Sequence, residues 1–293
     1  MKLNAGFLLV CCAVLFFAGT GSAEEASLLP EGTAGQQFEG FNLQGYTDGG
    51  NKSWDVSGDT ANIMGSIIHL TNIDANMYGE TPANLKAEKG ILDKESGNIH
   101  LEKDVVITSE AGDRMNTESL DWNRNKDLVT TNDLVTITNE KLQAVGQGMT
   151  AHPNLKIAQL NEDVKVDFKD PQAKTKEEAT VTITSDGPME IDQLKNTAIF
   201  NENVVAIQPG RELKADKMEV LFDPAGKRIS RIICTGNVEV TQGENKSFSE
   251  TAVYTADDKK MILSGRPKLI LIINENEEGG GTGFDALGPM SQK

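Results

Sequence analysis

The stretch TGNVEVTQG, residues 235–243, decides the fold class. It begins with small and polar residues, continues with two valines that are separated by one residue, and ends at polar residues. The same design occurs in EKDVVITSE, residues 102–110, and in TNDLVTITNE, residues 131–140. Such alternation over a short stretch is typical of a β-strand with one buried face. The chain therefore repeats one kind of strand.

The apolar pairs of this repeat recur at similar spacing. They are Val105/Ile107, Val135/Ile137, Val164/Val166, Val205/Ile207, Val238/Val240 and Leu269/Leu271, with steps of 30, 29, 41, 33 and 31 residues between the first members. A second signal, a small residue followed by an acid, recurs at 87–88, 117–118, 185–186, 215–216 and 249–250. Turn sequences such as DKESGN, residues 93–98, lie between the two signals. The pattern predicts about seven two-strand units with hairpin turns.

A two-strand unit cannot bury its apolar face alone, so stacked units are expected to form two facing antiparallel sheets of an all-β protein. A β-bulge near the small-acid signal would change which residues of the second sheet face inward. The side chains expected between the sheets are Leu92, Val105, Ile107, Trp122, Val135, Ile137, Val164, Val166, Val205, Ile207, Val220, Phe222, Val238, Val240 and Tyr254.

The same inward set is compatible with two interiors. If the sheets pack closely, the side chains interdigitate in a dry core. If the sheets splay apart along one edge, the same residues line an apolar groove, which would accept acyl chains with about 0.8 kcal/mol for each buried CH₂ group. The pattern leaves both possibilities open.

Composition narrows the range of partners. The chain has 293 residues, of which 38% are hydrophobic and only 5% aromatic, which favours sheets rich in Val, Ile and Leu. Lys and Arg number 28 against 44 Asp and Glu, so the formal charge is 28 − 44 = −16. A surface this acidic repels nucleic acid at long range, and no nucleic-acid partner is expected.

The two ends of the chain differ from the repeats. Residues 1–23 contain one early lysine and an apolar run, which indicates an export signal peptide or, if it is not cleaved, an N-terminal membrane anchor. Residues 24–39 are expected to form a flexible lead, and the acidic, Gly-rich residues 274–293 a disordered tail. The charged stretch 169–179 is expected to be a loop within one stack or a joint between two domains.

The outermost strands of a stack leave backbone groups unpaired unless another chain covers them. We expect these edges near Trp54 and Val56 at one end and near Leu269 and Leu271 at the other, and a partner strand can pair there. An edge protected by the charged tail is the alternative.

No catalytic residues, metal ligands or cofactors are expected. His69, His100 and His152 are not at metal-ligand spacing from one another, and no nucleophile or phosphate-binding motif is found. After removal of the signal, Cys234 is the one remaining cysteine and is expected to be a buried apolar residue. The protein is therefore not expected to be an enzyme.

Residues 234–271, CTGNVEVTQGENKSFSETAVYTADDKKMILSGRPKLIL, resemble the OstA-like repeat of the periplasmic lipopolysaccharide-transport protein LptA. The N-terminal half is similar to LptC, through SWDVSGDTANI, residues 53–63, and LKAEKGILDKESGNIHLEKDVVI, residues 85–107. The resemblance implies an LptC-like region at 40–168 and an LptA-like region at 180–273. One chain that joins both halves, with an acidic tail, departs from the pattern of either family.

The resemblance implies a β-jellyroll that is V-shaped in section, whose apolar slit carries the acyl chains of lipopolysaccharide or a similar glycolipid toward the outer membrane. Its implied partners are other jellyroll proteins of this transport system, paired end to end in the periplasm, and a homo-oligomer is possible. A structural envelope protein with a dry core and no ligand is the alternative. A polysaccharide-acting enzyme on a β-solenoid is disfavoured, because the acidic residues fall in turns and not in clusters on a sheet face.

Overall fold

The computed structural model describes residues 35–47, 49–79, 82–140, 142–169, 180–224, 228–258 and 260–272. They divide into two compact units. The N-terminal unit contains the described residues up to 140 together with 145–160, and the C-terminal unit contains residues 142–144 together with those from 161 onward. Both units consist of β-strands joined by short turns, so the expected all-β fold is confirmed.

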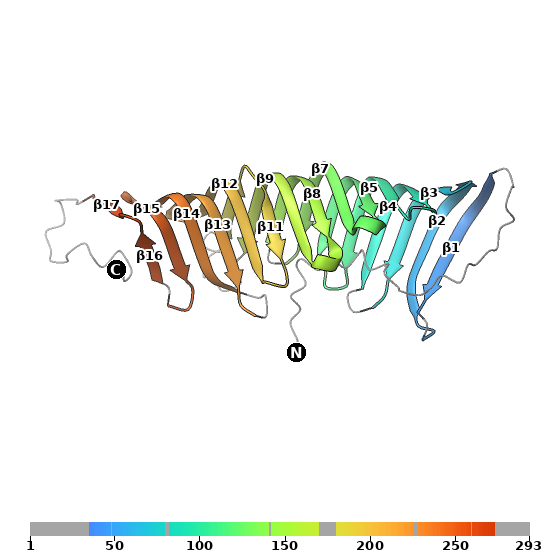
Figure 1. Cartoon of the computed structure of the whole chain (residues 1–293), viewed down its shortest axis with the longest axis horizontal. Helices are drawn as coiled ribbons and strands as arrows, with labels where there is room; N and C mark the ends of the chain where they lie inside the picture. The colour runs from blue at the N-terminus through green and yellow to red at the C-terminus, as the bar shows by residue number, and fades with distance from the viewer. Residues whose placement is uncertain are drawn as a thin grey trace. The chain divides into compact units, whose positions relative to one another are not determined.

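The strands of the N-terminal unit run in chain order from blue to green in Figure 1. They are β1 (Gln36–Tyr46), β2 (Lys52–Met64), β3 (Ile67–Met77), β4 (Ala83–Asp93), β5 (Ile99–Ser109), β6 (Arg114–Asn123) and β7 (Leu128–Thr138), followed by β8 (Leu142–His152) and β9 (Ile157–Lys169), which the division between the units crosses. Each strand from β1 to β7 pairs with the next in antiparallel orientation. Two 3₁₀ helices, η1 (Arg124–Lys126) and η2 (Pro153–Leu155), form the turns before β7 and β9.

The C-terminal unit repeats this antiparallel order. Its strands are β10 (Thr180–Ser185), β11 (Met189–Asp192), β12 (Thr197–Gln208), β13 (Arg211–Phe222), β14 (Ile229–Gln242), β15 (Asn245–Thr255), β16 (Lys260–Ser264) and β17 (Lys268–Ile270). Both β10 and β11 pair with β12, and both β16 and β17 pair with β15. The interruptions contain Gly and Pro, in SDGP at 185–188 and SGRP at 264–267, because proline cannot donate a hydrogen bond to a continuing ladder.

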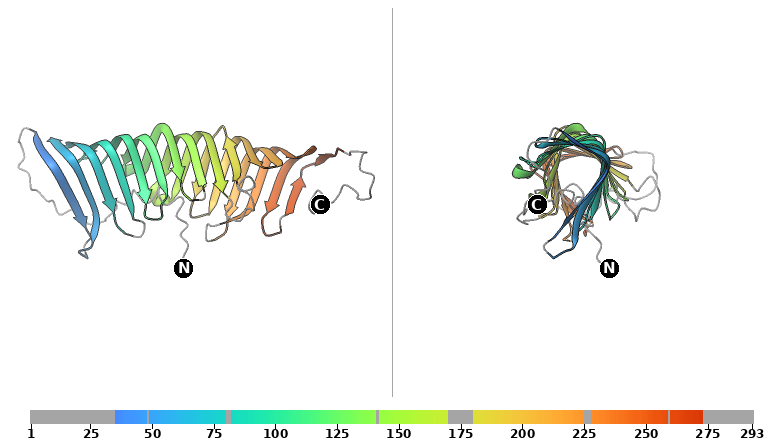
Figure 2. Two further views of the ribbon diagram at one scale, coloured as in Figure 1. Left: turned by 180° about the vertical axis from the view of Figure 1, so that it is seen from behind. Right: turned by 90° about the vertical axis from the view of Figure 1, so that its right-hand side faces the viewer.

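Most long strands bend at a β-bulge near the middle. The pairing register shifts between Glu102 and Val105 on β5 and between Thr235 and Val238 on β14. The bulge residues Lys103, Asp104 and Asn237 have φ values of 65°, 49° and 47°, the left-handed region that bulges require. The strands β1 and β2, drawn in blue in Figure 2, also curve, although no register shift interrupts the middle of their pairing. The two halves of a bent strand therefore lie in two different walls of its unit, a wall being the part of the sheet on one side of the bends.

The bulges explain the small-acid signal in the sequence. Its small residue faces inward where the walls approach each other, and Ala87 and Ala215 are each only 5% exposed. Its acid instead reaches the bulge of a neighbouring strand: Asp186 accepts a hydrogen bond of 2.7 Å from the amide of Asn203. In the repeat that lacks the acid, Gln147 takes this place and donates to the carbonyl of Asn132. The acid, or Gln147 in its place, therefore connects one strand to the bulge of its neighbour and stabilises the bend.

The centre of each unit is closely packed. Val105 and Val135 in the N-terminal unit, and Phe200 and Val204 in the C-terminal unit, are fully buried at 0% exposure. A side chain at Gly90 on β4 would overlap Ile73, which reaches it from the other half of β3. The two walls therefore touch at the bend, where the end of the Ile73 side chain occupies the space beside Gly90.

The structure corrects one sequence-based expectation about the ends of the chain. The flexible lead was expected to extend to residue 39, but β1 begins at Gln36 because Phe38 and Glu39 pair with Ala61 and Thr60 of β2. The expected signal peptide at 1–23 and the expected disordered tail at 274–293 lie outside the described residues. Within the described part of the chain, no helix is long and apolar enough to span a membrane.

Candidate functional site

One wall of the N-terminal unit carries a continuous row of apolar side chains beside its turns. Cross-strand pairing connects, in order, Ile63, Ile68, Leu92, Ile99, Trp122 and Val129. We call these six residues the N-terminal inner row. Val129 and Trp122 are 1% and 7% exposed, whereas the other four side chains are half-buried. The row therefore changes from enclosed at β6 and β7 to accessible at β2.

The C-terminal unit has an equivalent row, in which pairing connects Ala198, Val220, Ile232, Tyr254 and Met261. We call it the C-terminal inner row. Val220 is fully buried, whereas Ile232, Tyr254 and Met261 are half-buried. This row also becomes accessible toward the last strands of its unit.

The apolar interior is open at the terminal strand of each unit. Leu43 and Phe38 on β1 pair with the inward-facing Val56 and Ala61, but they are 52% and 44% exposed. At the other terminal strand, Leu269 on β17 pairs with the buried Ser247 and is 43% exposed. These inward-facing side chains are exposed because, among the described residues, no further strand covers them.

Most of the residues that sequence analysis placed between the sheets are enclosed there. Those that are buried are Val105, Ile107, Trp122, Val135, Ile137, Val164, Val166, Val220 and Val238. Those that are half-buried are Leu92, Phe222, Val240 and Tyr254. Leu92 and Trp122 belong to the N-terminal inner row, and Val220 and Tyr254 to the C-terminal one. Contact of these residues with lipid stays a prediction.

The inward placement of Val205 and Ile207 was wrong. Val205 pairs with Lys214 and Ile207 with Glu212, on the outer face, and Ile207 is 48% exposed. The inward residue is the fully buried Val204, which follows the bulge at Glu202 and Asn203 directly. In NVVAI, residues 203–207, the first valine, Val204, therefore corresponds to Val105. The sequence analysis had selected the second valine, Val205, because its spacing from Ile207 matched the other apolar pairs.

The expected partner edge at Trp54 and Val56 was also wrong. Both residues lie on β2, which has β1 on one side and β3 on the other. The terminal strand is β1, and sequence analysis missed it because its exposed, Gln- and Gly-rich sequence resembles a flexible lead. At the other end, Leu269 does lie on the terminal strand β17, while Leu271 follows it and is half-buried.

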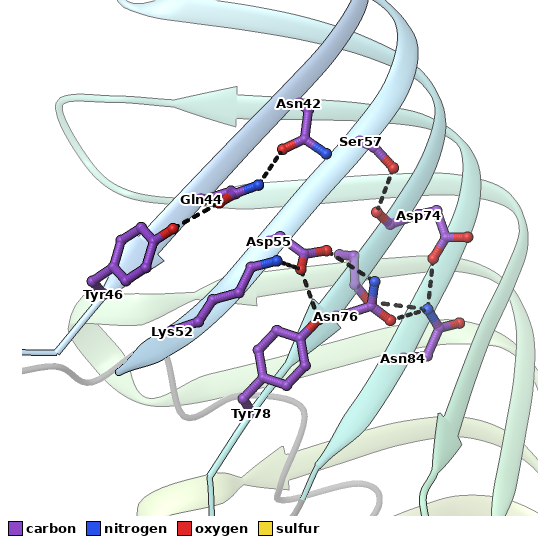
Figure 3. A network of polar contacts seen from close by, with 11 residues as sticks. Asn42, Gln44, Tyr46, Lys52, Asp55, Ser57, Asp74, Asn76, Tyr78 and Asn84 are labelled. Carbon is purple, nitrogen blue, oxygen red and sulfur yellow. Dashed lines mark hydrogen bonds and ion pairs between the residues drawn. The ribbon is translucent and has the colours of Figure 1, made fainter. Parts of the chain in front are cut away.

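A polar network covers the outer face of β2, β3 and β4 (Figure 3). Asp55 is only 7% exposed, and it accepts hydrogen bonds of 2.9 Å from Asn76 and 2.7 Å from the hydroxyl of Tyr78. With the ion pair to Lys52, these contacts lower the pKa of Asp55 to about 2, the bond from Asn76 contributing most. Asn84 continues the network by donating to Asn76 at 2.9 Å. The carboxylate of Asp55 thus has three partners, Lys52, Asn76 and Tyr78, and its role is to join neighbouring strands.

A second polar group on the outer face surrounds His100. Its Nδ1 lies 2.7 Å from Asp121 and its Nε2 lies 3.0 Å from Glu102. The hydrogen bond to Glu102 is the main cause of the raised pKa of His100. Because both ring nitrogens face carboxylates, the doubly protonated imidazolium fits this position. The described residues hold no group of three or more His, Cys, Asp or Glu that could bind a metal ion.

Cys234 behaves as its sequence context predicts. It is 1% exposed, and burial raises the pKa of its thiol to about 12. At neutral pH it is a thiol with little nucleophilic character. It contributes to the core and not to a reactive site.

Sequence analysis missed four of the six residues of the N-terminal inner row, namely Ile63, Ile68, Ile99 and Val129. All four lie near turns, within four residues of a Gly or Asn, and outside the valine pairs that define the repeat. On β5 the bulge at Lys103 and Asp104 breaks the alternation between the valine pair and Ile99. Cross-strand pairing is what places them in one line.

Bent antiparallel strands, apolar inner rows and interiors open at the terminal strands define a repeat-built β-jellyroll with an apolar interior. Residues 7–169 match the family of LptC-related lipopolysaccharide-assembly proteins, and because this match spans more than half of the chain, the chain belongs to that family. Residues 182–278 match the family of LptA and LptD N-terminal lipopolysaccharide-transport proteins. No curated protein matches the chain. The resemblance of the two halves to two Lpt families is confirmed, and with it a role in lipopolysaccharide transport.

Proposed function

We propose that the chain carries lipopolysaccharide or a related glycolipid by its acyl chains, along the apolar interiors of its units, toward the outer membrane. The observation that carries this proposal is the change in exposure along the inner faces. Apolar side chains are buried in the middle of each unit but accessible in the inner rows and at β1 and β17. An acyl chain that covers such side chains gains about 0.8 kcal/mol for each CH₂ group it buries.

The location that we propose is the periplasm. Both matched families serve lipopolysaccharide assembly or transport, and residues 1–23 have the pattern of an export signal. No cofactor, metal or chemical step is required for this function. When a lipid moves from one apolar interior to the next, its acyl chains exchange one set of apolar contacts for another, and no covalent bond changes. The division into an LptC-like region that ends at residue 168 and an LptA-like region that begins at residue 180 is part of this proposal.

Photo-crosslinking tests the proposal with closely matched positions. Leu92 and Ile91 are neighbours on β4 and both are half-buried, but Leu92 belongs to the inner row and Ile91 pairs with His69 and His100 on the outer face. In the C-terminal unit, Ile232 and Ile233 form the same kind of pair. A photoreactive residue at Leu92 or Ile232 should capture lipid in cells, whereas one at Ile91 or Ile233 should not. Equal capture at both members of a pair would refute the carrier function.

We also propose that other jellyroll proteins of the transport system, or further copies of this chain, pair with β1 and β17. A partner strand would cover the exposed Leu43 on β1 and Leu269 on β17 and would extend the apolar interior. For self-association, sedimentation of the purified protein should show oligomers that Leu43→Lys removes while Leu134→Lys, at an exposed leucine of β7, does not. Oligomers that are unchanged by Leu43→Lys would contradict pairing through β1.

The fully buried centres favour a second candidate, a structural envelope protein with a dry core and no ligand. Val105, Val135 and Phe200 leave no surface for a lipid unless the walls separate. Native mass spectrometry after gentle extraction distinguishes the candidates. A carrier should retain bound glycolipid, whereas a dry structural protein should show only the mass of the polypeptide.

A further inference from the structure

Three successive turns of the N-terminal unit are joined to one another. The amide of Asn125 donates to the carbonyl of Ser96 at 3.2 Å. The backbone N–H of Asn154 donates to the carboxylate of Asp127 at 2.9 Å. These contacts connect residues 93–98, 123–127 and 152–156, and we call the three segments together the turn ridge. The ridge lies at the strand ends that carry the N-terminal inner row.

The turn ridge carries four cations in a chain whose formal charge is −16. Lys94, Arg124 and Lys126 are exposed and Lys156 is half-buried. In the part of the chain that the structure describes, none of the three lysines lies within ion-pair distance of a carboxylate. By contrast, Lys195 in the corresponding turn of the C-terminal unit lies 2.6 Å from Asp192.

The carboxylates of the ridge are largely occupied. Asp93 accepts hydrogen bonds of 2.6 Å from the hydroxyl of Ser96 and 3.0 Å from the backbone of Glu95. Asp127 accepts the bond from Asn154. Glu95 is the exposed carboxylate that remains near the lysines. With four cations against these three carboxylates, the ridge carries a small excess of positive charge.

One cation of the ridge lies directly against the apolar row. The guanidinium carbon of Arg124 lies over the ring of Trp122, 5.6 Å from its centroid. Trp122 is the point at which the row changes from enclosed to accessible, since its neighbour Ile99 is half-buried. A molecule whose acyl chains cover Ile99 and Leu92 would thus have its polar end beside Arg124 and Lys94.

We propose that the turn ridge binds the phosphate group of an anionic amphiphile whose acyl chains cover the N-terminal inner row. This inference rests on the proposed carrier function and adds the recognition of the head group. Arginine can bind two phosphate oxygens at once, and lysines add point charges around it. Because the lysines lie at the surface, salt screens their charges, and the contribution of the phosphate group to the binding affinity should fall as the salt concentration rises.

Binding of two lipids with identical acyl chains to the purified full-length protein tests the inference. The probes are dihexanoyl phosphatidic acid, dihexanoylglycerol and inorganic phosphate. The ridge variant is Lys94→Gln/Lys126→Gln/Lys156→Gln. The control variant Lys89→Gln/Lys169→Gln/Lys217→Gln removes the same charge from exposed lysines outside the ridge. Arg124→Gln is measured separately, with Trp122 fluorescence in a Trp54→Phe background and unfolding to verify that the row is intact.

We expect the ridge variant to bind phosphatidic acid about tenfold more weakly at low salt, with a smaller difference at high salt. Dihexanoylglycerol should bind the wild type and both variants equally, and the control variant should change neither affinity by more than about twofold. Equal loss of phosphatidic acid binding in the ridge and control variants would overturn the inference while leaving the carrier function intact.

Two other results would also be decisive. If inorganic phosphate binds as tightly as phosphatidic acid, the ridge is a phosphate site that does not involve the acyl chains, and the inference about an amphiphile is wrong. If neither lipid binds to the wild type, the carrier function and the inference fail together.

Discussion

Asp216 on β13 and Asn237 on β14 are joined across a bulge, because the side-chain amide of Asn237 donates to both carboxylate oxygens of Asp216, at 2.9 and 3.2 Å. The adjacent Gly236 has a φ of 79°, and the space where its Cβ would lie is occupied by Asp216. One acid thus fixes the bend and requires the glycine. The same relationship explains why TGNV in the sequence is accompanied by a small-acid signal.

Gly236→Ala should lower the free energy of unfolding more than Gly243→Ala. Both glycines have positive φ, at 79° and 58°, so both substitutions cost about 1–2 kcal/mol for the left-handed backbone. Only Gly236 adds a clash with Asp216, since a Cβ at Gly243 meets nothing within 4 Å. Urea unfolding of the two variants measures the difference. Adding Asp216→Ala should recover part of the loss in Gly236→Ala, and no recovery would contradict the role of the acid.

Val204→Ala should destabilise the protein more than Val205→Ala. Val204 is fully buried and leaves a cavity, which costs about 1–3 kcal/mol, whereas Val205 is half-buried on the outer face and should cost less than about 1 kcal/mol. Thermal or urea unfolding of the two variants is the measurement. A larger loss of stability in Val205→Ala than in Val204→Ala would show that Val205 faces inward, as the sequence spacing predicted.

His100 should make stability depend on pH. Its pKa is raised in the folded protein, so the stability it contributes is fully present below its unfolded pKa and is lost as pH rises through the folded value. Its partner Glu102 has a lowered pKa, so that contribution is lost only under acidic conditions. The melting temperature of the wild type should therefore fall between about pH 6 and pH 8.

His100→Gln should remove most of this change, whereas His69→Gln, on the same outer face, should leave it in place. A titration of the histidine ring by NMR gives the pKa of His100 directly. An unshifted pKa, or a pH dependence that persists in His100→Gln, would contradict the role of the two carboxylates.

Asp55→Ala should lower the free energy of unfolding by about 2 kcal/mol at neutral pH. The reason is that Lys52, Asn76 and Tyr78 all lose the carboxylate to which they donate. The pKa of Asp55 is lowered to about 2, so its contribution is present above its unfolded pKa and is lost as pH falls toward 2. Urea unfolding at pH 7 and pH 3 should show a smaller difference between wild type and variant at the lower pH. Asp59→Ala, at an exposed acid of the same strand, should cost less. Equal losses in the two variants would show that the network contributes little.

The sequence by itself determined the all-β fold, the repeat, the turns and most of the buried valines. Alternation and turn residues are local properties, so Val105, Val135 and Val238 could be assigned without any knowledge of their partners. The relation to the Lpt families is likewise carried by local motifs such as TGNVEVTQG. Local patterns cannot show which of two adjacent apolar residues faces inward after a bulge, which is why Val205 was chosen over Val204.

Only the tertiary structure decided the inner rows, the terminal strand β1 and the turn ridge. Ile63, Leu92 and Trp122 come from different hairpins, and only cross-strand register aligns them. Likewise, Asn125 and Asn154 join turns that are separate in the sequence. The physical reason is that the bulges fix where each strand bends, and the direction of a side chain beyond a bend depends on the strands beside it.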